Sequence, residues 1–410
     1  MSPESRAAAF RRIAPSLLRA AQAVLRRSKA RARRVCVNVA ARAFDVTLLD
    51  AAALERESGP RFRRYGPAER IEVPTPTAIG TMPAAFKARI GHWTLDESWA
   101  VEIPRARLLG PGAVGFSESG DILADTVIPE NYRLPDGISL RAMARRFGSR
   151  ADRSHAACAT SLVGPWSQSY FHWVVEYLPR LELVRRYADD TGVVPRLIID
   201  QNPRPWQLES LRLLGFAEDD VEPWNGTSMS VARLVVTAFP RRYAGPGRTV
   251  SMVSPRALRW MAAAFGARVL PPSRAPRARR ILISRSAQAG RRVLNEPELL
   301  GALAQFGFRS YVLEEMSFAE QARTFAEADV VIGPHGAGLA NIAFATSPVV
   351  VELIGGYCNA SFMTLAASLQ ARYACIRCTP VGTGHPTRGN LMVDPDDVVG
   401  VLDSLGVPPL

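Results

Sequence analysis

A glycine-rich loop that contains a histidine carries the clearest chemistry in the sequence. The segment Gly333-Pro-His-Gly-Ala-Gly-Leu-Ala-Asn341 follows an apolar run, 329–332, that predicts a strand, and it precedes a run that predicts a short helix. In a parallel sheet this loop would lie at the carboxyl end of a strand, where ligands bind. Gly336 and Gly338 would allow close approach of the backbone, and the N–H groups of the next helix would favour a diphosphate. His335 could donate a hydrogen bond to a phosphate oxygen or to a leaving group. The spacing fits neither GxGxxG nor a P-loop, and a turn required only for packing is the alternative.

Arginines gather in a second loop, which also follows a predicted strand, 280–283. Arg285, Arg291 and Arg292 would bring guanidinium groups to the same edge of the sheet, where they could bind phosphate bidentately. A leaving nucleoside diphosphate needs such positive charge when no metal supplies it. A solvated loop in an arginine-rich protein is the alternative interpretation.

A carboxylate lies at the end of the next predicted strand, one βα unit after the glycine-rich loop. Glu352 ends the apolar run 349–351, which predicts a strand buried on both faces. An acid at this point could bind ribose hydroxyls, as in nucleotide-binding folds. The alternative is an acid that simply lies in solvent at a strand end.

A histidine and a glutamate share one face of a helix predicted around residues 169–178. His172 and Glu176 are four residues apart, a spacing that makes them neighbours on a helix. The pair could act as a general base and the group that orients it. The alternative is a core helix in which His172 is only the hydrogen-bond partner of Glu176. Pro179 is expected to end or kink the helix.

The elements that must position these residues alternate regularly after residue 279. Strands are predicted at 280–284, 311–313, 329–333 and 349–354, and helices at 297–306, 317–328 and 339–345, with a capping box of Ser317 and Glu320. This alternation predicts βαβ units and a parallel sheet of the doubly wound kind. Residues 155–268 alternate less cleanly, and 35–150 are β-rich. We therefore expect an α/β protein that is divided into four parts. These are a basic arm (1–34), an N-terminal domain (35–268), a linker (269–278) and a C-terminal nucleotide-binding domain (279–410).

The positive charge of the chain is concentrated in its first residues. The protein has 410 residues and a net charge of +13, and residues 1–34 contribute ten basic residues against Glu4, or +9. The remaining residues carry only +4, so a nucleic-acid-binding body is not indicated. The arm is not typical of a secretory signal, because Arg19 interrupts its apolar stretch. Its apolar residues recur at helical spacing, so it could lie on an anionic membrane, pack on the body or remain solvated.

Cysteines and acids offer little support for a metal or a cofactor. The chain has five cysteines, and Cys375 and Cys378 form a lone CxxC in a predicted strand, which favours buried structural thiols over a metal or redox site. The DxD at Asp394-Pro-Asp396 precedes a helical run and is typical of a helix N-cap. We expect no bound metal and no cofactor.

Taken together and in this order, these motifs resemble the family 61 glycosyltransferases. The matching segments are 171–181, 284–296, 320–321, 332–341 and 351–352, and the likeness covers about residues 155–375. The resemblance implies a GT-B type fold, in which two Rossmann-like domains face a cleft, with β-rich N-terminal additions here. It also implies inverting transfer from a nucleotide sugar, usually without a metal.

The resemblance assigns roles to particular residues. The acceptor-side base would be His172 or Glu176, with the other residue orienting it. The donor-binding residues would be Arg285, Arg291, Arg292, Asn295, Glu296, His335, Gly336, Ala337, Gly338, Asn341 and Glu352.

The predicted function is therefore transfer of a sugar from a nucleotide-diphosphate donor to a glycan or lipid-linked acceptor, in capsular or surface polysaccharide biosynthesis. We expect the protein in the cytoplasm, where the arm would hold it at the inner face of the plasma membrane as a peripheral protein. Two other classes compete with this prediction. One is a non-catalytic nucleotide-sugar-binding scaffold or sensor. The other is a nucleic-acid-binding protein that uses the arm, which the near-neutral body disfavours, so no nucleic acid is expected as a partner.

Overall fold

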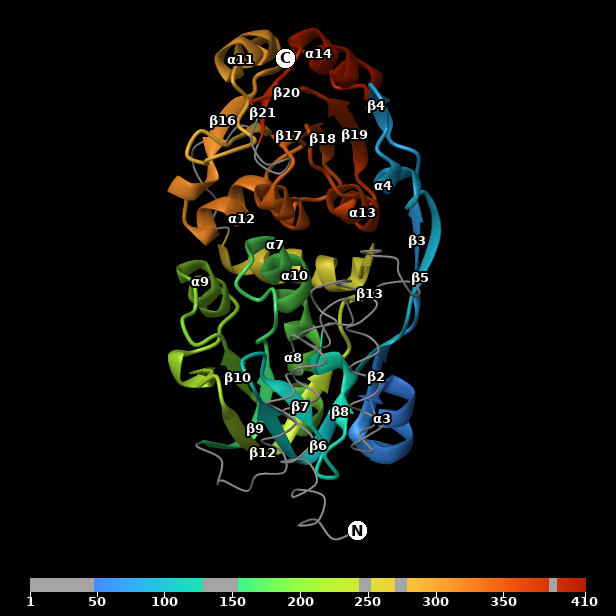
Figure 1. Cartoon of the computed structure of the whole chain (residues 1–410), viewed down its shortest axis with the longest axis vertical. Coiled ribbons are helices and arrows are strands. Elements are labelled where there is room, and N and C mark those ends of the chain that lie inside the picture. Colours follow the sequence, from blue (N-terminus) through green and yellow to red (C-terminus); the bar gives the residue numbers. More distant parts are fainter. Residues whose placement is uncertain (1–47, 128–153, 243–251, 270–278, 383–388) are drawn as a thin grey trace, which may run out of the picture.

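The computed structural model describes residues 48–127, 154–242, 252–269, 279–382 and 389–410. The predicted arm and nearly all of the predicted linker lie outside these residues. Two halves are stacked along the long axis of the molecule (Figure 1). Both are mixed α/β structures with parallel strand pairs, which agrees with the predicted class. No described helix combines the length and the apolar character that a membrane span requires.

The lower half in Figure 1 is built on a nine-stranded mixed sheet. The strands follow the order β1-β8-β7-β6-β12-β9-β10-β11, with β2 paired to β6 beside this path. The pairs β12–β9, β9–β10 and β10–β11 are parallel, whereas β2, β7 and β12 run antiparallel to β6. The strands are β1 (Leu48–Leu49), β2 (Phe62–Gly66), β6 (Ser98–Leu109), β7 (Val114–Phe116), β8 (Ile122–Leu123), β9 (His155–Ser161), β10 (Arg196–Ile199), β11 (Val221–Pro223) and β12 (Ser228–Thr237).

Helices and short segments complete this half. The helices are α3 (Ala51–Ser58), α7 (Tyr170–His172), α8 (Leu181–Thr191), α9 (Pro205–Leu213) and α10 (Pro255–Val269). Between α7 and α8 the backbone forms a π turn, Trp173–Tyr177, and a 3-10 turn, Leu178–Arg180. Pro179 lies in that 3-10 turn, so the predicted break in the helix occurs where proline removes a backbone donor. A two-stranded ribbon, β13 (Arg241–Arg242) with β14 (Met252–Val253), leads to α10.

The upper half is a six-stranded parallel sheet with helices on both faces. Its order is β16-β15-β17-β18-β19-β4, and all five pairings are parallel. In Figure 1, α12 and α13 lie on the side toward the lower half, and α11 and α14 lie on the far side. The strands are β15 (Arg280–Ser284), β16 (Arg309–Val312), β17 (Val330–Pro334), β18 (Val349–Ile354) and β19 (Arg372–Arg377), and the helices are α11 (Glu296–Leu303), α12 (Phe318–Ala326), α13 (Ser361–Ser368), α14 (Pro395–Ser404) and the 3-10 helix Ala337–Phe344.

Local signals in this half appear as the sequence predicts. Every residue of β18 is buried, as expected for a strand covered on both faces. The Ser317 side chain accepts a hydrogen bond from the backbone N–H of Glu320, and the Glu320 carboxylate accepts from that of Ser317, which completes the capping box of α12. Asp394 caps α14 in the same way by accepting from the N–H of Asp396, so this DxD serves a helix start. A small ribbon, β20 (Thr379–Val381) with β21 (Asn390–Met392), lies beside the sheet.

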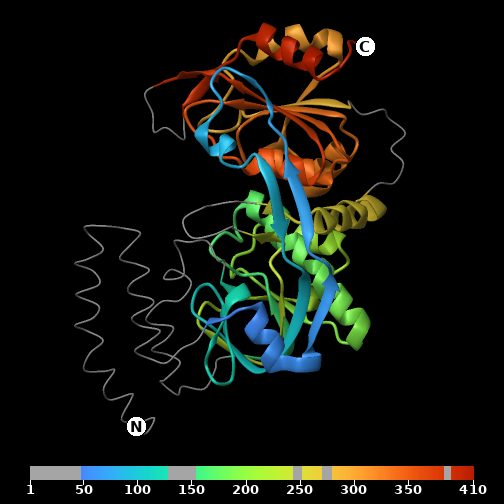
Figure 2. The same ribbon diagram turned by 90° about the vertical axis from the view of Figure 1, so that its right-hand side faces the viewer.

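A segment of the N-terminal part crosses to the upper half. We call residues 67–96 the strap; it contains β3 (Glu69–Val73), β4 (Thr77–Ile79), α4 (Ala84–Lys87) and β5 (Gly91–Leu95). β3 and β5 pair with each other and run along one side of both halves, and β4 joins the upper sheet beside β19 (Figures 1 and 2). β4 is therefore an edge strand of the C-terminal sheet, although it belongs to residues that the predicted division at 269–278 assigns to the N-terminal domain.

The two halves share one hydrophobic core. A single cluster of buried side chains includes Leu197 and Ile199 of β10 together with Ile283 of β15 and Val331 of β17. Phe171 meets Phe362 edge-on across the boundary, with ring centroids 5.4 Å apart. The halves are therefore joined by packed apolar surface as well as by the chain.

Candidate active site

A cavity of about 530 Å³ lies between the two halves. Trp166, Phe171, His172 and Arg241 of the lower half line one side. The upper half contributes Arg291, the start of the glycine-rich loop, and residues around the start of α13. The strap adds Ala85 and Arg89. The upper-half residues are Arg291, His335, Gly336, Ala337, Tyr357, Asn359, Ala360, Ser361, Phe362 and Thr364.

His172 faces this cavity with a buried carboxylate behind it. Its Nδ1 lies 2.8 Å from Oε1 of Glu176, and the Glu176 side chain has no exposed surface. When the ring is neutral and Nδ1 donates to the carboxylate, Nε2 is left as the basic nitrogen. The π turn that follows α7 brings the two side chains together as the i, i+4 spacing predicts. His172 lines the cavity and Glu176 does not, so the histidine is the member of the pair that a ligand can reach.

Burial and the charge of Arg241 set the protonation of His172. Burial lowers the pKa of its imidazole to about 3, and the positive charge of Arg241 contributes in the same direction. The Trp166 ring stacks on the imidazole, with centroids 5.2 Å apart and an interplanar angle of 14°. At neutral pH the ring is uncharged, which is the state a general base requires.

Arg241 is a site residue that the sequence analysis did not identify. Its guanidinium is buried, donates to Oε1 of Glu176 and forms an ion pair with that carboxylate. It also lies over the Phe171 ring at 5.4 Å. Glu176 and Arg241 are 65 residues apart, and nothing in the pattern around Arg241 distinguishes it from the chain's many other arginines.

His335, in the upper half, also has a buried carboxylate hydrogen-bonded to its Nδ1. Its Nδ1 is hydrogen-bonded to Glu352, and the Tyr373 hydroxyl donates to the other oxygen of that carboxylate. Glu352 pairs in register with Gly333 on the adjacent strand, so β17 and β18 bring the two side chains together. Glu352 has no exposed surface and does not line the cavity. In the structure Glu352 orients His335, and its expected contact with a ribose stays a prediction.

Arg291 lies between the glycine-rich loop and the cavity. Its guanidinium donates to the backbone carbonyl of His335 at 2.6 Å and lies 6.0 Å from the Tyr357 ring. The backbone of Arg291 is in the left-handed region, with φ of 58°. Burial lowers the pKa of its guanidinium, which nevertheless stays charged at neutral pH.

Arg285 lies directly behind the glycine-rich loop. A Cβ added to Gly336 would overlap its guanidinium, and φ of Gly336 is 175°, so this glycine serves close approach rather than a special backbone conformation. Burial, together with the charge of Arg291, lowers the pKa of Arg285 to about 10. A Cβ on Gly338 would lie 2.8 Å from Cδ1 of Leu313, so Gly338 is needed for packing.

Seven of the eleven predicted donor-binding residues do not line the cavity. Three of them, Arg285, Gly338 and Glu352, are described above, and the other four are Arg292, Asn295, Glu296 and Asn341. Arg292 is exposed, and its backbone N–H donates to Asn390. The Asn295 amide bonds the backbone of Val393, and the Glu296 carboxylate accepts from Ser284 and Ser310. These three residues hold the arginine loop and its neighbouring strands in place.

Asn341, the fourth, joins the two halves. It is fully buried, donates to Gln321 at 2.9 Å and accepts from the Tyr170 hydroxyl at 2.6 Å. Tyr170 begins α7, which ends with His172. This bond therefore fixes the helix that carries His172 against the 3-10 helix that follows the glycine-rich loop.

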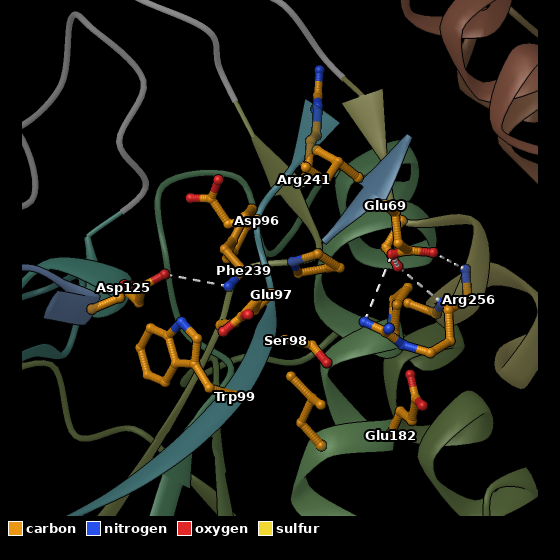
Figure 3. A pocket seen from close by; sticks show the side chains of 18 of the residues that line it. Glu69, Asp96, Glu97, Ser98, Trp99, Asp125, Glu182, Phe239, Arg241 and Arg256 are labelled. Atoms are coloured by element: carbon orange, nitrogen blue, oxygen red, sulfur yellow. Dashed lines mark hydrogen bonds and ion pairs between the residues drawn. The ribbon is translucent and has the colours of Figure 1, made fainter. Parts of the chain in front are cut away.

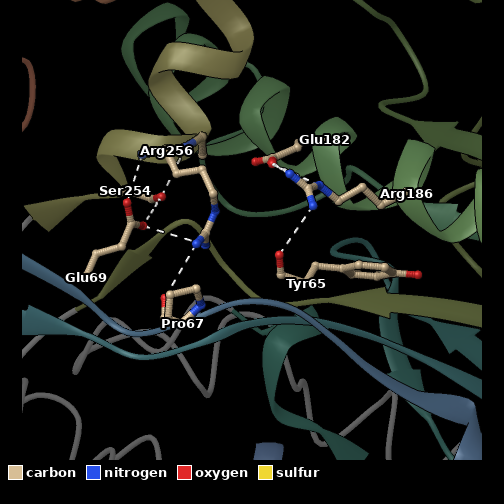
Figure 4. A network of polar contacts seen from close by, with 8 residues as sticks. Tyr65, Pro67, Glu69, Glu182, Arg186, Ser254 and Arg256 are labelled. Carbon is tan, nitrogen blue, oxygen red and sulfur yellow. Dashed lines mark hydrogen bonds and ion pairs between the residues drawn. The ribbon is translucent and has the colours of Figure 1, made fainter.

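A second cavity, of about 340 Å³, lies in the lower half, and Arg241 lines both cavities (Figure 3). It lies at the carboxyl ends of β1, β8 and β12, and its walls carry several acids that bond to groups of the protein itself. Figure 4 shows two of these: Glu69 accepts from Ser254 and from the backbone of Arg256, and Glu182 pairs with Arg186 at 2.9 Å. In Figure 3 Asp125 accepts from the backbone N–H of Phe239. These bonds stabilise the lower half beside the candidate site.

Metal ligands and reactive thiols are not prominent in the described part of the chain. No group of three or more histidine, cysteine or acidic side chains is arranged to hold a metal ion within those residues. Cys375 and Cys378 are buried and free, and burial raises the pKa of each thiol to about 12. This agrees with their interpretation as structural thiols.

The comparison with known families agrees with this geometry. Residues 170–351 match the family model described as Glycosyltransferase 61. The matched region begins at Tyr170, beside His172, and ends at Val351, just before Glu352. The match supports a glycosyltransferase, and in particular one of family 61, as the motif resemblance indicates. No curated protein matches the chain at a significant level.

Proposed function

We propose that the protein is an inverting glycosyltransferase with a GT-B type arrangement of its two halves. It moves a sugar from a nucleotide-diphosphate donor to a glycan or glycolipid acceptor, in surface polysaccharide biosynthesis. One observation carries this proposal: His172 with its Glu176–Arg241 support and His335 with its Glu352–Tyr373 support enter the same cavity from opposite halves.

The upper half is the donor side of the cavity. The glycine-rich loop follows the carboxyl end of β17, the edge of a parallel sheet where nucleotides bind. Arg291 and His335 line the cavity and supply donors for the oxygens of a diphosphate. Positive charge at this position stabilises the negative charge that develops on the leaving diphosphate.

The lower half is the acceptor side. His172 Nε2 removes the proton of the acceptor hydroxyl while the hydroxyl oxygen attacks the anomeric carbon. The bond between that carbon and the diphosphate oxygen breaks, and its electron pair leaves with the nucleoside diphosphate. Attack from the lower half and departure toward the upper half lie on opposite faces of the sugar, so the anomeric configuration inverts. Glu176 holds the ring through Nδ1 and does not itself contact the acceptor.

A binding experiment tests the donor site. Thermal shifts with UDP, GDP, CDP and dTDP are measured for the wild type and for His335→Ala, Arg291→Ala and Arg292→Ala. One nucleoside diphosphate should stabilise the wild type and Arg292→Ala, because Arg292 lies outside the cavity. The same nucleotide should give a much smaller shift with the other two variants. Equal shifts in all four proteins would contradict this donor site.

Turnover separates the enzyme from a binding protein. The wild type should release nucleoside diphosphate from the matching nucleotide sugar in the presence of acceptor, and His172→Ala should bind the donor but turn it over 10²–10⁴-fold more slowly, roughly the contribution of a general base. Nucleotide binding without release by the wild type would support the scaffold or sensor instead. The anomeric configuration of the product, measured by NMR, tests inversion.

The basic arm suggests where the protein acts. We place it in the cytoplasm at the inner membrane face, where lipid-linked acceptors and anionic headgroups meet the +9 charge of residues 1–34. Deletion of residues 1–34 should abolish sedimentation with anionic vesicles and preserve turnover of a soluble acceptor. Unchanged sedimentation would exclude this role of the arm.

A further inference from the structure

The strap brings a cation of the N-terminal part to the donor side of the cavity. β3 and β5 run beside both halves. α4, which lies between β3 and β5 in the sequence, is located at the upper half (Figures 1 and 2). Ala85 of α4 and Arg89, two residues beyond the end of α4, line the cavity.

The tip of the strap is fixed to the upper half. β4 pairs in parallel register with β19, with Thr77 opposite Ala374 and Ile79 opposite Ile376. Phe86 is fully buried, and its ring centroid lies 6.2 Å from that of Tyr373. Tyr373 holds Glu352, and Glu352 holds His335. The strap therefore packs directly against the support of a donor-side residue.

The backbone of Arg89 is held from both sides. Its N–H donates to the carbonyl of Phe86 at 2.8 Å, and its carbonyl accepts from Nε1 of Trp93 at 2.8 Å. The side chain is half-buried and faces the cavity. The backbone that carries the side chain is thus an anchored turn, and the guanidinium donates to the carbonyl of Ala88 at 3.3 Å.

The charges around the cavity indicate what Arg89 would bind. Among the described residues, those that line the cavity include three arginines, Arg89, Arg241 and Arg291, and no aspartate or glutamate. The charge of Arg241 is balanced by its ion pair with Glu176. The lining thus receives one cation from the strap, Arg89, and one from the arginine loop, Arg291. A diphosphate carries at least two negative charges and gains more as the glycosidic bond breaks.

We propose that Arg89 binds the diphosphate of the donor together with Arg291, so that the strap completes the phosphate site from the N-terminal part of the chain. This inference rests on the proposed function. Donor affinity would then depend on the docking of α4 and β4 on the upper half. A phosphate site built from the upper sheet alone would not depend on the strap.

Direct binding of nucleotides to the full chain tests this role. Calorimetry with inorganic pyrophosphate, and with the nucleoside diphosphate and monophosphate of the preferred base, compares the wild type with Arg89→Ala, Arg89→Lys and Lys87→Ala. Lys87 is the matched control, because it is an exposed cation of α4 that does not line the cavity.

Loss of a charge-assisted contact should weaken diphosphate and pyrophosphate binding by about ten- to a hundred-fold in Arg89→Ala. Arg89→Lys should retain part of the affinity as a point charge, and Lys87→Ala should match the wild type. Monophosphate affinity should change less than diphosphate affinity. A melting temperature without ligand equal to that of the wild type shows that the variant is folded.

The outcomes separate this proposal from the one on which it rests. If the wild type binds the diphosphate and Arg89→Ala binds it equally well, Arg89 has no role at the phosphates and the donor site stands. An Arg89→Ala effect confined to the KM of the acceptor would likewise overturn the inference in favour of an acceptor contact. A wild type that binds neither pyrophosphate nor any nucleoside diphosphate would overturn both proposals.

Discussion

At the scale of the residue, the two histidines of the cavity differ in what lies behind their carboxylates. Glu176 is bound to the cation Arg241, whereas Glu352 is bound to the neutral hydroxyl of Tyr373. A carboxylate that already pairs with an arginine does little to stabilise an imidazolium. Arg241 therefore helps to keep His172 in its uncharged, basic form.

A change at Arg241 should move the pH profile. The imidazole pKa lies below its ordinary value of about 6.5, so the active neutral form persists into acid. Arg241→Gln removes the cation and leaves the Glu176 charge unbalanced beside the ring, and both changes raise the His172 pKa. Between pH 4.5 and 8 the kcat/KM of the wild type should show no acid limb from His172, whereas the kcat/KM of Arg241→Gln should fall toward the acid end of that range.

Arg241→Lys is the control for this measurement because it keeps the positive charge. Its pH profile should stay close to that of the wild type even if kcat falls. Superimposable profiles for Arg241→Gln and the wild type would show that His172 is not the base or that Arg241 does not act on it.

Gly336→Ala should affect the donor more than the fold. The extended backbone of Gly336 accepts alanine, but the added Cβ would displace the Arg285 guanidinium. A guanidinium at the end of a flexible side chain can move, so we expect a change of less than about 1 kcal/mol in the free energy of unfolding. The KM for the donor should rise about tenfold if Arg285 supports the phosphate site.

Gly301→Ala provides the matched comparison for Gly336→Ala. It lies inside α11, where an added Cβ meets nothing within 4 Å, so it should stabilise the protein by about 0.5–1 kcal/mol through helix propensity. Its donor KM should equal that of the wild type. Donor kinetics that change equally in both variants would point to a general effect on the upper half.

At the scale of the element, the strap is held by one large side chain. Phe86 is fully buried, and Phe86→Ala should cost about 3–5 kcal/mol, the range for deletion of a buried phenyl ring. Urea unfolding measures this loss. Lys87→Ala, one residue away and exposed, should change stability by less than about 0.5 kcal/mol. A small effect of Phe86→Ala would mean that the strap is not docked in solution.

Local elements of the upper half could be predicted because their signals lie within a few residues of one another. The capping box at Ser317 and Glu320, the apolar run of β18 and the glycine-rich loop are each specified by neighbouring residues. The contact between His172 and Glu176 could likewise be predicted, since i, i+4 spacing is a local property.

The elements that were missed depend on distant partners. β4 has only three residues, and its pairing with β19 joins positions almost 300 residues apart in the chain. Arg241 and Tyr373 acquire their roles only through the carboxylates that folding places beside them. Asn295, Glu296 and Asn341 carry polar groups suited to a ligand, but the structure uses them to fix loops and to join the halves.

At the scale of the whole molecule, the shared core predicts cooperative unfolding. Apolar side chains of both sheets belong to one buried cluster, and Tyr170 and Asn341 are hydrogen-bonded across the boundary. All seven tryptophans precede residue 279, so tryptophan fluorescence reports on the N-terminal part, whereas far-UV circular dichroism reports on both halves. The two urea transitions should coincide. Two separated midpoints would show that the halves unfold independently.

The parallel pairing of β4 with β19 also joins a strand that is synthesised early to a strand that is synthesised late. The ribosome completes β4 long before β19, because β4 ends at Ile79 and β19 begins only at Arg372. At bacterial and eukaryotic elongation rates of about 5–20 residues per second, this interval is on the order of 15–60 s. During that time the nascent strap carries an edge strand without its partner and a phenylalanine without its pocket. Such a segment is a natural target for a chaperone on the emerging chain, and the last strands to be made decide when the cavity is complete.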